Sequence, residues 1–350
     1  ERPEFDELIT GTAAFTMFVY AWWPTLTAPG ALGRLADPDL VRRLSGSLLS
    51  NAECELLSQS YSAGELTDWT TADGALLDEL VHLLGPVPAP DEPEVSLFLD
   101  SDAGVSEVVT TADRLSNARE IDPFDAPHPT FAHILVDEAQ DITPMQWRML
   151  RRRGPSASWT IVGDPAQSSW PDPEESRRAL NEIVGTAPVR QFRMSTNYRS
   201  PSEVFDLAAQ VVVSAFPEAD LPKAVRSVGI EPQLAVAGPG RLAETAVDLV
   251  GELLAQVEGT VGVITPASAK AAVSARLAQA GLADEDRIAI VTPVESKGLE
   301  YDGVLVVTPD EIVATSPGGV RALYVALTRP TMRLVTLDAA PGADWRRSLG

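Results

Sequence analysis

Lysine is scarce in this sequence, and its absence before Lys223 excludes a common way of binding nucleotides. Only Lys223, Lys270 and Lys297 are lysines, whereas arginine supplies 24 of the 27 basic residues. A phosphate-binding loop of the form G-x-x-x-x-G-K-[ST] needs a lysine that reaches the β- and γ-phosphates, and the chain has no such motif. Without the backbone N–H groups of that loop, triphosphate binding loses its main anchor. We therefore expect these 350 residues alone to hydrolyse little or no nucleoside triphosphate.

Cysteine and long apolar runs are also rare. A single cysteine, Cys54, excludes an internal disulfide and any cysteine-rich metal cluster, and the three histidines lack the spacing of metal ligands. No run of about 18 apolar residues predicts a membrane span. The apolar stretch Ala13–Trp23 lacks a basic leader and ends at Pro24, so it reads as a core helix rather than a signal peptide. We expect a cytoplasmic protein with no membrane partner.

Acidic residues dominate, and they are unevenly distributed. The formal charge is −23, and residues 1–133 hold 23 acidic against 6 basic residues, whereas residues 134–350 hold 27 against 21. Affinity for nucleic acid comes largely from basic side chains that displace counterions, so this first third should bind nucleic acid poorly without specific contacts. It fits a basic protein partner or a basic channel better. The alternative is an acidic surface that only aids solubility.

From Phe131 onward, apolar strands alternate with helices. This alternation predicts parallel sheets with helices on both faces, and 350 residues are enough for two such domains. Ser200-Pro201-Ser202-Glu203 predicts a helix that starts with a capping box. Earlier helices are expected near 4–23, 38–49 and 74–84, and later ones near 242–257, 268–280 and 319–328. The expected strands are 134–137, 159–162, 189–194, 233–237, 261–265, 288–292, 304–308 and 334–337.

Two adjacent carboxylates follow the first of these strands. The apolar run Ile134–Val136 leads directly into Asp137 and Glu138. Open α/β sheets place their ligands at the carboxyl ends of the strands. An aspartate there can hold Mg²⁺ against nucleotide phosphates, and a neighbouring glutamate can orient and deprotonate an attacking water. The alternative is an acidic strand end that merely turns into the next helix.

Two further clusters lie at later strand ends. Gly163–Gln167 follows the strand near 159–162, where the Gln167 amide can bond a γ-phosphate or its water. Tyr198 and Arg199 offer a ring that can stack on a base and a guanidinium that can bind phosphate in a bidentate manner. Each cluster alone is weak evidence for a nucleotide site, because such turns usually cap a helix or face solvent.

The last two clusters lie near the end of the chain. The loop Glu295–Asp302 contains Lys297 and Gly298, where glycine permits a tight path, and Glu300, which can accept hydrogen bonds from ribose hydroxyls. Tyr324–Arg329 ends a helix with an arginine placed like an arginine finger. Five clusters in this order make coincidence a poor explanation.

Residues 134–337 resemble superfamily 1 helicases of the UvrD/Rep type in motifs II to VI. The resemblance implies an α/β fold of RecA-like parallel sheets flanked by helices, one partial domain (1A) and one complete domain (2A), that binds ATP or GTP with Mg²⁺ between them. By position, it makes Asp137 the Mg²⁺ ligand, Glu138 the catalytic base and Tyr198 the adenine-stacking ring. The same carry-over gives γ-phosphate contacts to Gln167, Arg199 and Arg329, a ribose contact to Glu300, and further nucleotide contacts to Lys297 and Gly298.

Three features depart from that family. The phosphate loop is missing, and with Glu1 in place of a methionine this favours a carboxyl-terminal part of a longer protein over a degenerate relative. Residues 201–287 leave no room for the large 2B insertion of processive members. After Gln167 the chain has Ser168–Asp172 instead of an aromatic residue and an Arg-Gly pair that contact DNA. Trp170 can still stack on a base, although a buried tryptophan explains it equally well. Pro330 follows Arg329 where alanine is common.

A narrower resemblance accommodates these departures. The segments Asp137–Leu150, Trp69–Leu80 and, more weakly, Ala21–Thr27 are similar to HelD-type helicase-like factors, which act on bacterial RNA polymerase. This resemblance implies nucleotide-linked release of RNA polymerase from nucleic acid. It divides the chain into an acidic, mainly helical part of domain 1A and an inserted module (1–130), the end of domain 1A (131–196) and domain 2A (197–350).

Three functions therefore remain open. The first is a HelD-like NTPase that binds RNA polymerase, and the second is a UvrD-type DNA helicase or repair motor. The third is a non-enzymatic binding module with a helicase fold. The first two require the carboxylates Asp137 and Glu138 to lie near the guanidinium groups of Arg199 and Arg329.

Overall fold

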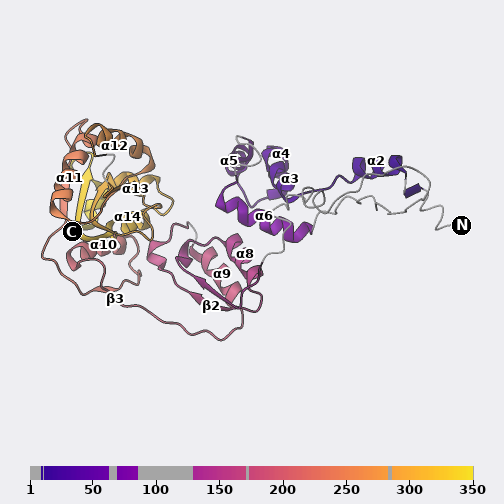
Figure 1. The fold of residues 1–350 in the computed structure, drawn as a ribbon, viewed down its shortest axis with the longest axis horizontal. Helices are drawn as coiled ribbons and strands as arrows, with labels where there is room; N and C mark the ends of the chain where they lie inside the picture. Colours follow the sequence, from indigo (N-terminus) through magenta and orange to yellow (C-terminus); the bar gives the residue numbers. More distant parts are fainter. Residues whose placement is uncertain are drawn as a thin grey trace, which may run out of the picture. The chain divides into compact units, whose positions relative to one another are not determined.

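The computed structural model describes residues 9–10, 12–62, 69–85, 129–170, 173–282 and 286–349. The chain forms two compact units (Figure 1). We call Glu1–Ala132 with Met145–Ala157 the helical unit, and His133–Pro144 with Ser158–Gly350 the sheet unit. Most of segment 86–130, whose fold the sequence did not predict, lies outside the described residues. The domain boundaries at 130 and 196 stay predictions.

Short helices make up the described part of the helical unit. The helix α6 begins with a capping box, because Thr70 Oγ1 accepts from the Asp73 N–H and the Asp73 carboxylate accepts from the Thr70 N–H. Leu77 of α6 packs with Ala28 and Leu32 in a small apolar core. The helices are α2 (Ala13–Trp22), α3 (Ala28–Gly33), α4 (Pro38–Ser45), α5 (Asn51–Ser62), α6 (Thr71–Leu84) and α8 (Pro144–Arg153), with the 3-10 turn η1 (Arg34–Ala36).

A five-stranded parallel sheet is the core of the sheet unit. Its strand order is β5-β9-β8-β6-β7, and β6 and β8 are almost wholly buried, as expected for strands covered on both faces. The structure therefore confirms the predicted α/β fold of parallel sheets flanked by helices. The strands are β5 (Gln233–Val236), β6 (Val261–Ile264), β7 (Ile288–Val291), β8 (Tyr301–Val307) and β9 (Pro330–Asp338).

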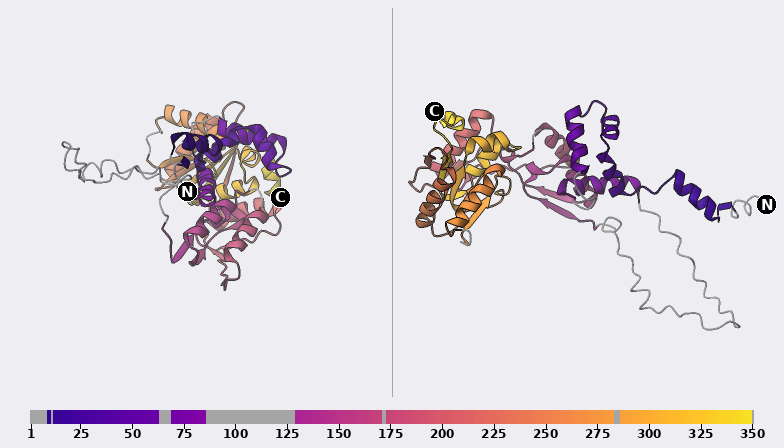
Figure 2. Two further views of the ribbon diagram at one scale, coloured as in Figure 1. Left: turned by 90° about the vertical axis from the view of Figure 1, so that its right-hand side faces the viewer. Right: turned by 90° about the horizontal axis from the view of Figure 1, so that it is seen from above.

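Two apolar clusters cover the faces of this sheet. One joins the sheet to α10 (Ser202–Ala215), α13 (Pro309–Thr315) and α14 (Val320–Leu327). The other joins it to α11 (Leu242–Gln256) and α12 (Ala267–Gln279). Figure 2 shows these helices around the strands from two further directions. Arg329 lies between the end of α14 and the start of β9.

The remaining strands form two small parallel pairs. Strand β1 (His133–Val136) pairs with β2 (Ser158–Ile161), and Val136 lies opposite Ile161. Strand β3 (Thr196–Asn197) pairs with β4 (Lys223–Ala224). Helix α9 (Pro173–Val184) and the turns η2 (Ala139–Asp141), η3 (Pro165–Gln167) and η4 (Asp344–Leu349) complete the unit. The pairing of β1 with β2 brings the segments that follow both strands to one edge.

Three local predictions are wrong. The apolar stretch Ala13–Trp23 forms helix α2, but it is not a core helix, because Met17, Phe18 and Trp22 are 73%, 52% and 69% exposed. Residues 189–194 form no strand, and Phe192 and Met194 are 87% and 86% exposed. A strand requires hydrogen-bonding partners, and none of the described strands pairs with this segment. The capping box at Ser200–Glu203 is also absent. Helix α10 follows Pro201 without a side-chain cap, and the Glu203 carboxylate accepts instead from the N–H of Gly229 at 2.7 Å.

Candidate functional site

The carboxyl end of β1 holds Glu138 in an unusual backbone conformation. Its φ is 52°, in the left-handed region that a glutamate rarely adopts. Such a conformation costs on the order of 1 kcal/mol or more and persists where surrounding contacts fix it. Here the Glu138 N–H donates to Asp137 Oδ1 at 2.9 Å, and the next N–H, of Ala139, donates to Val162 O at 2.9 Å. The two candidate carboxylates are therefore fixed at the strand end.

A chain of four hydrogen bonds, three between side chains and one from a backbone N–H, leads from Glu138 to Arg329. Gln140 Nε2 donates to Glu138 Oε2 at 2.5 Å, and Gln140 Oε1 accepts from the Asp164 N–H at 2.9 Å. Gln167 Nε2 donates to Asp164 Oδ2 at 2.7 Å, and Gln167 Oε1 accepts from Arg329 Nη2 at 2.9 Å. The structure thus brings three predicted site residues from distant parts of the sequence into one hydrogen-bonded network.

Gln140 and Asp164 are the two members of this network that the sequence did not single out. Both lie inside recognised clusters, yet their role as connecting groups depends on how the segments after β1 and β2 approach each other. A Cβ on Gly163 would lie 2.9 Å from Gln140 Oε1. Only glycine therefore leaves room for the Gln140 amide. Gly163 is the sequence feature that could have indicated this close approach of the two segments.

Arg329 is the most buried charged residue of the network, with 2% exposure. It follows α14, and its Nε donates to Val325 O at 3.0 Å while Nη1 donates to Leu299 O at 3.4 Å. Burial lowers the pKa of Arg329, and the positive charge of Arg199 lowers it further, whereas Glu138 and Glu300 oppose this change. The guanidinium therefore lies in the electrostatic field of three other predicted site residues.

Arg199 and Tyr198 lie at the start of the predicted second domain. Arg199 Nε forms an ion pair with Glu300 Oε1 at 2.6 Å, and both side chains are about half exposed. Asn197 Oδ1 accepts from the N–H groups of Arg199 and Ser200, which fixes this turn. Tyr198 is 73% exposed, and its ring is open to stacking. This turn presents a cation and an aromatic ring on the surface.

The loop between β7 and β8 carries Lys297 and Gly298. Gly298 has a φ of 69°, in the left-handed region that glycine adopts readily, which fits the tight backbone path expected there. The ammonium group of Lys297 lies against the segments that follow β1 and β2, and it donates to Asp141 Oδ2 at 2.5 Å. Its acceptors in this structure are protein groups, and its predicted role as a nucleotide contact stays a prediction.

Trp170 has intramolecular partners. Its indole Nε1 donates to Glu175 Oε2 at 3.1 Å, its N–H donates to Ser168 Oγ at 3.2 Å, and its side chain is partly buried. A role in stacking on a base would have to compete with the bond to Glu175. The predicted contact with nucleic acid stays a prediction.

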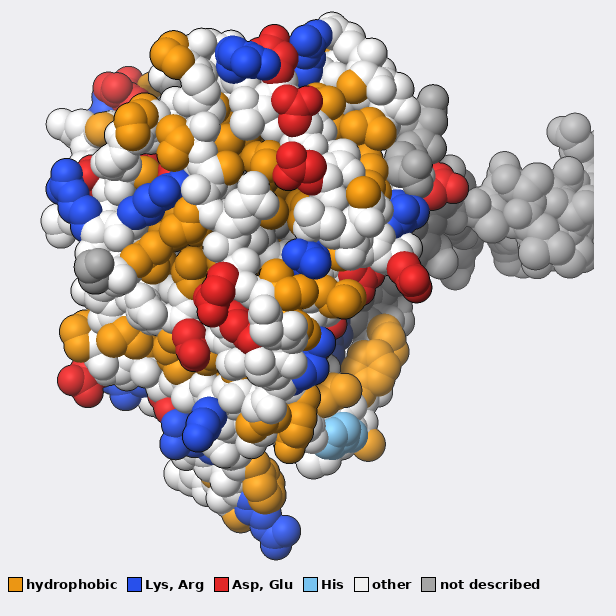
Figure 3. Space-filling view, turned by 90° about the vertical axis from the view of Figure 1, so that its left-hand side faces the viewer, with side chains coloured by type: hydrophobic (Ala, Val, Ile, Leu, Met, Phe, Trp, Pro, Cys, Tyr) orange, Lys and Arg blue, Asp and Glu red, His pale blue; other side chains and the backbone are white. Residues whose placement is uncertain are grey.

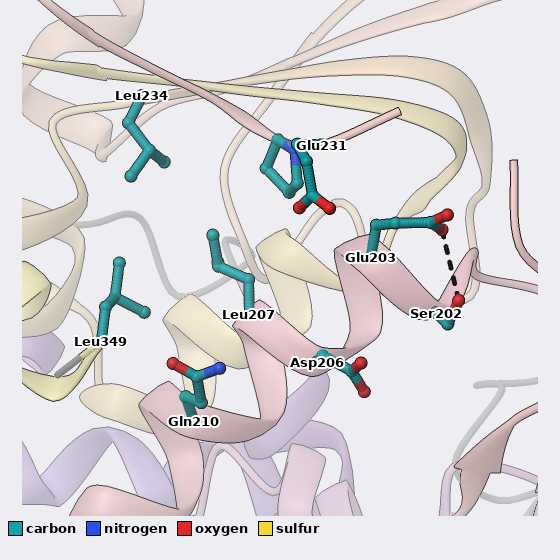
Figure 4. Close-up of a pocket in the computed structure, with 9 residues that line it drawn as sticks. Ser202, Glu203, Asp206, Leu207, Gln210, Glu231, Leu234 and Leu349 are labelled. Atoms are coloured by element: carbon teal, nitrogen blue, oxygen red, sulfur yellow. Dashed lines mark hydrogen bonds between the residues drawn. The ribbon is translucent and has the colours of Figure 1, made fainter. Parts of the chain in front are cut away.

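A surface cavity of about 330 Å³ lies apart from these residues (Figure 4). Glu203, Asp206 and Leu207 of α10 line it together with Glu231 and Leu349. None of its lining residues belongs to the predicted site. The candidate site is therefore the hydrogen-bonded network, and the cavity is not part of it.

The donor set at β1 suits magnesium only together with a nucleotide. Among the described residues, no group of three histidine, cysteine or carboxylate side chains could hold a metal ion by itself. Magnesium usually takes one or two protein carboxylates and obtains its other ligands from phosphates and water. Asp137 at the strand end fits that requirement.

Comparison with known proteins relates the chain to helicases. Residues 105–170 match the family model of the UvrD/REP helicase N-terminal domain, and this range includes β1, β2 and the segments after them. The coarser resemblance to superfamily 1 helicases is therefore confirmed, and the HelD-type resemblance stays a prediction. No curated protein matches the chain.

In the part of the chain that the structure describes, no helix is long and apolar enough to cross a membrane.

Solved structures show weaker similarity. The C-terminal domain of a possible DNA helicase from Lactobacillus plantarum WCFS1 is 20% identical, with 44% of this chain and 94% of that chain covered and a TM-score of 0.34. The Arterivirus nonstructural protein 10 (helicase) is 14% identical, with 63% and 42% covered and a TM-score of 0.36. Its complex with DNA gives 13% identity, the same coverage and a TM-score of 0.37. These values add no argument about function.

Proposed function

We propose that this chain carries the hydrolytic residues of a superfamily 1 helicase-like NTPase that binds ATP or GTP with Mg²⁺. The single observation that carries the proposal is the hydrogen-bonded chain from Glu138 through Gln167 to Arg329. A structural ion pair would need only two partners. This network instead connects a strand-end carboxylate, an amide and a buried guanidinium, which are the group types that phosphoryl transfer requires. The proposal takes the phosphate-binding loop to lie in another part of a longer parent protein, which we call the full-length protein.

The proposed roles follow from the chemistry of each group. Bound magnesium would supply charge neutralisation on the β- and γ-phosphates, with Asp137 as its protein ligand. Glu138 accepts a proton from water as the water oxygen bonds to the γ-phosphorus and the bond to the bridging β,γ-oxygen breaks. The Gln167 amide orients that water, and the Arg329 guanidinium stabilises the charge on the γ-phosphate oxygens.

Nucleotide binding requires Arg329 to exchange partners. Its Nη2 donates to Gln167 Oε1 and Thr328 Oγ1, and only 2% of the residue is exposed. A γ-phosphate must therefore replace the Gln167 oxygen as acceptor, which frees the Gln167 amide for water. The catalytic arrangement would therefore form only when nucleotide is present and the bond between Arg329 and Gln167 is broken.

We further propose RNA polymerase as the partner, with NTP turnover releasing it from nucleic acid. The support is the HelD-like segments and the 23 acidic residues against 6 basic ones in residues 1–133, a composition that suits a basic protein channel. The test uses the full-length protein and a polymerase bound to a labelled nucleic acid. Added NTP should release the label, and Glu138→Gln should bind polymerase without releasing it. A full-length protein that fails to bind polymerase contradicts this part of the proposal.

A DNA-unwinding motor is the second candidate, favoured by the match to the UvrD/REP domain. On the face shown in Figure 3, basic and acidic side chains are interspersed and do not form a continuous basic patch. A motor of this kind should bind single strands with an affinity that falls steeply with salt. Tight strand binding at physiological salt, without polymerase, would favour this candidate. A full-length protein without NTP hydrolysis would leave the third function, a binding module.

A further inference from the structure

We propose that Lys297 is a positioning residue that fastens the loop between β7 and β8 to the segments after β1 and β2, and so sets how Gln167 meets Arg329. The inference rests on the proposed function for its catalytic consequence, but its structural part can be tested separately. We define the segment 292–300 as the lysine loop. Lys297 suits this role because it binds the Gln167 backbone, while Leu299 of the same loop accepts from Arg329.

The ammonium group of Lys297 uses all three of its donors. It donates to Asp141 Oδ2 at 2.5 Å, to Ser169 Oγ at 2.6 Å and to Gln167 O at 2.9 Å. The acceptors lie 156, 128 and 130 residues away in the sequence. The Lys297 side chain is 13% exposed and that of Asp141 is 25% exposed, so solvent screens this pair less than a surface pair. An ammonium with three protein acceptors is saturated.

The acceptors are themselves held in place. Asp141 Oδ1 accepts from the Ser169 N–H at 2.8 Å, so both carboxylate oxygens are engaged. Ser168 Oγ donates to Gln140 O at 3.0 Å, which ties the segment after β2 to the segment after β1. The acceptors of Lys297 are therefore also held by contacts that do not involve the lysine.

The lysine loop also contacts both arginines of the site. Leu299 O accepts from Arg329 Nη1 at 3.4 Å, and Glu300 pairs with Arg199 at 2.6 Å. Within this short loop, Lys297 therefore binds the Gln167 backbone, and Leu299 and Glu300 bind the two guanidinium groups. Loss of the Lys297 contacts should let the loop shift and misalign Gln167 with Arg329.

A direct contact with nucleotide phosphate is the competing role for Lys297. It would require the ammonium to give up at least one of its three present acceptors. Under that role, substitution of Lys297 should weaken nucleotide binding first. Under the positioning role, it should slow turnover while nucleotide binding persists.

The structural test is hydrogen exchange on the 350-residue chain. We expect Lys297→Met to speed exchange of the amides at 166–169 and 296–299 by about tenfold or more, since charged hydrogen bonds are lost. The matched control is Lys223→Met, which changes an exposed lysine of β4 and should leave these amides unaffected. Unchanged exchange in Lys297→Met would overturn the proposal.

Asp141→Asn provides a second variant, which keeps the lysine and weakens its strongest partner. Combined with Lys297→Met, it should add little to the exchange rate, because both changes remove the same contact. Fully additive effects would overturn the direct coupling of Lys297 to Asp141. If Lys297→Met fails to fold, Asp141→Asn alone decides the question: faster exchange of the same amides supports the proposal, and unchanged exchange overturns it.

The functional test uses the full-length protein. Lys297→Met should lower kcat by about tenfold or more while the Kd for nucleotide changes by less than about threefold. A large rise in Kd with an unchanged kcat would identify a phosphate contact and overturn the positioning role. If wild-type protein shows no turnover, the proposed function fails, whereas hydrogen exchange still decides the structural role of Lys297.

Discussion

Replacement of Arg329 by methionine should separate stability from catalysis in this protein. The substitution removes the buried guanidinium but keeps a long, flexible side chain of similar reach. Four acceptors lose a donor: Val325 O, Gln167 Oε1, Thr328 Oγ1 and Leu299 O, at 3.0, 2.9, 3.3 and 3.4 Å. The first two distances are those of well-formed hydrogen bonds, whereas the last two are long and contribute less.

The expected change in stability is small because two effects oppose each other. Loss of two well-formed hydrogen bonds from a charged donor costs about 3–6 kcal/mol. Removal of a buried ion relieves a desolvation penalty of several kcal/mol, and burial is the main reason that the pKa of Arg329 is lowered. We expect a net loss of about 1–2 kcal/mol in the free energy of unfolding of the sheet unit. An arginine finger, by contrast, contributes roughly 10³–10⁵ to turnover.

The assay measures both quantities. Hydrogen exchange of β8 amides in the 350-residue chain reports the opening free energy of the sheet unit. NTP turnover of the full-length protein reports the catalytic loss. Arg276→Met, at an exposed arginine that forms an ion pair with Glu244 at 3.4 Å, is the matched control and should change stability by less than about 1 kcal/mol. A loss above about 4 kcal/mol in Arg329→Met, with turnover retained, would show that Arg329 is structural and refute the reasoning.

Three further predictions concern other parts of the sheet unit. Gly262→Ala should destabilise the sheet by about 1–3 kcal/mol in denaturant unfolding, because the added Cβ would lie 2.4 Å from the Tyr301 ring. The Ser227 hydroxyl, then backbone N–H groups, lower the pKa of Glu203 from 4.5 to about 2. The stability that Glu203 adds relative to Glu203→Gln should therefore be full above pH 4.5 and fall as pH drops toward 2, measured by thermal unfolding. Tyr198→Ala should leave the unfolding midpoint unchanged but weaken nucleotide binding by the full-length protein about two- to tenfold in titrations.

The sequence predicted the large sheet well because its strands are apolar on both faces. The expected strands at 261–265 and 288–292 differ from β6 and β7 by one residue at the end. Local pattern suffices there, since a continuous apolar run of this length fits a strand in a covered parallel sheet. Residues 189–194 also carry a strand-like pattern, yet a strand depends on a partner that no local pattern specifies.

The candidate site was predicted by residue type and not by partner. Strand-end position pointed to Asp137, Glu138 and Gln167, and helix-end position pointed to Arg329. The chain of hydrogen bonds that links them was not predictable, because the partner of an amide such as that of Gln140 depends on how distant loops approach. The contact of Lys297 with Asp141 spans 156 residues and was missed for the same reason.

Single-turnover hydrolysis by the full-length protein, compared with its Glu138→Gln variant, tests the central claim most directly. Loss of a general base should slow the chemical step by about 10²–10⁴-fold, and the isosteric amide should leave the Kd for nucleotide nearly unchanged. That pair of results would identify Glu138 as the group that accepts the proton of the attacking water. Hydrolysis at the wild-type rate by Glu138→Gln would contradict the account.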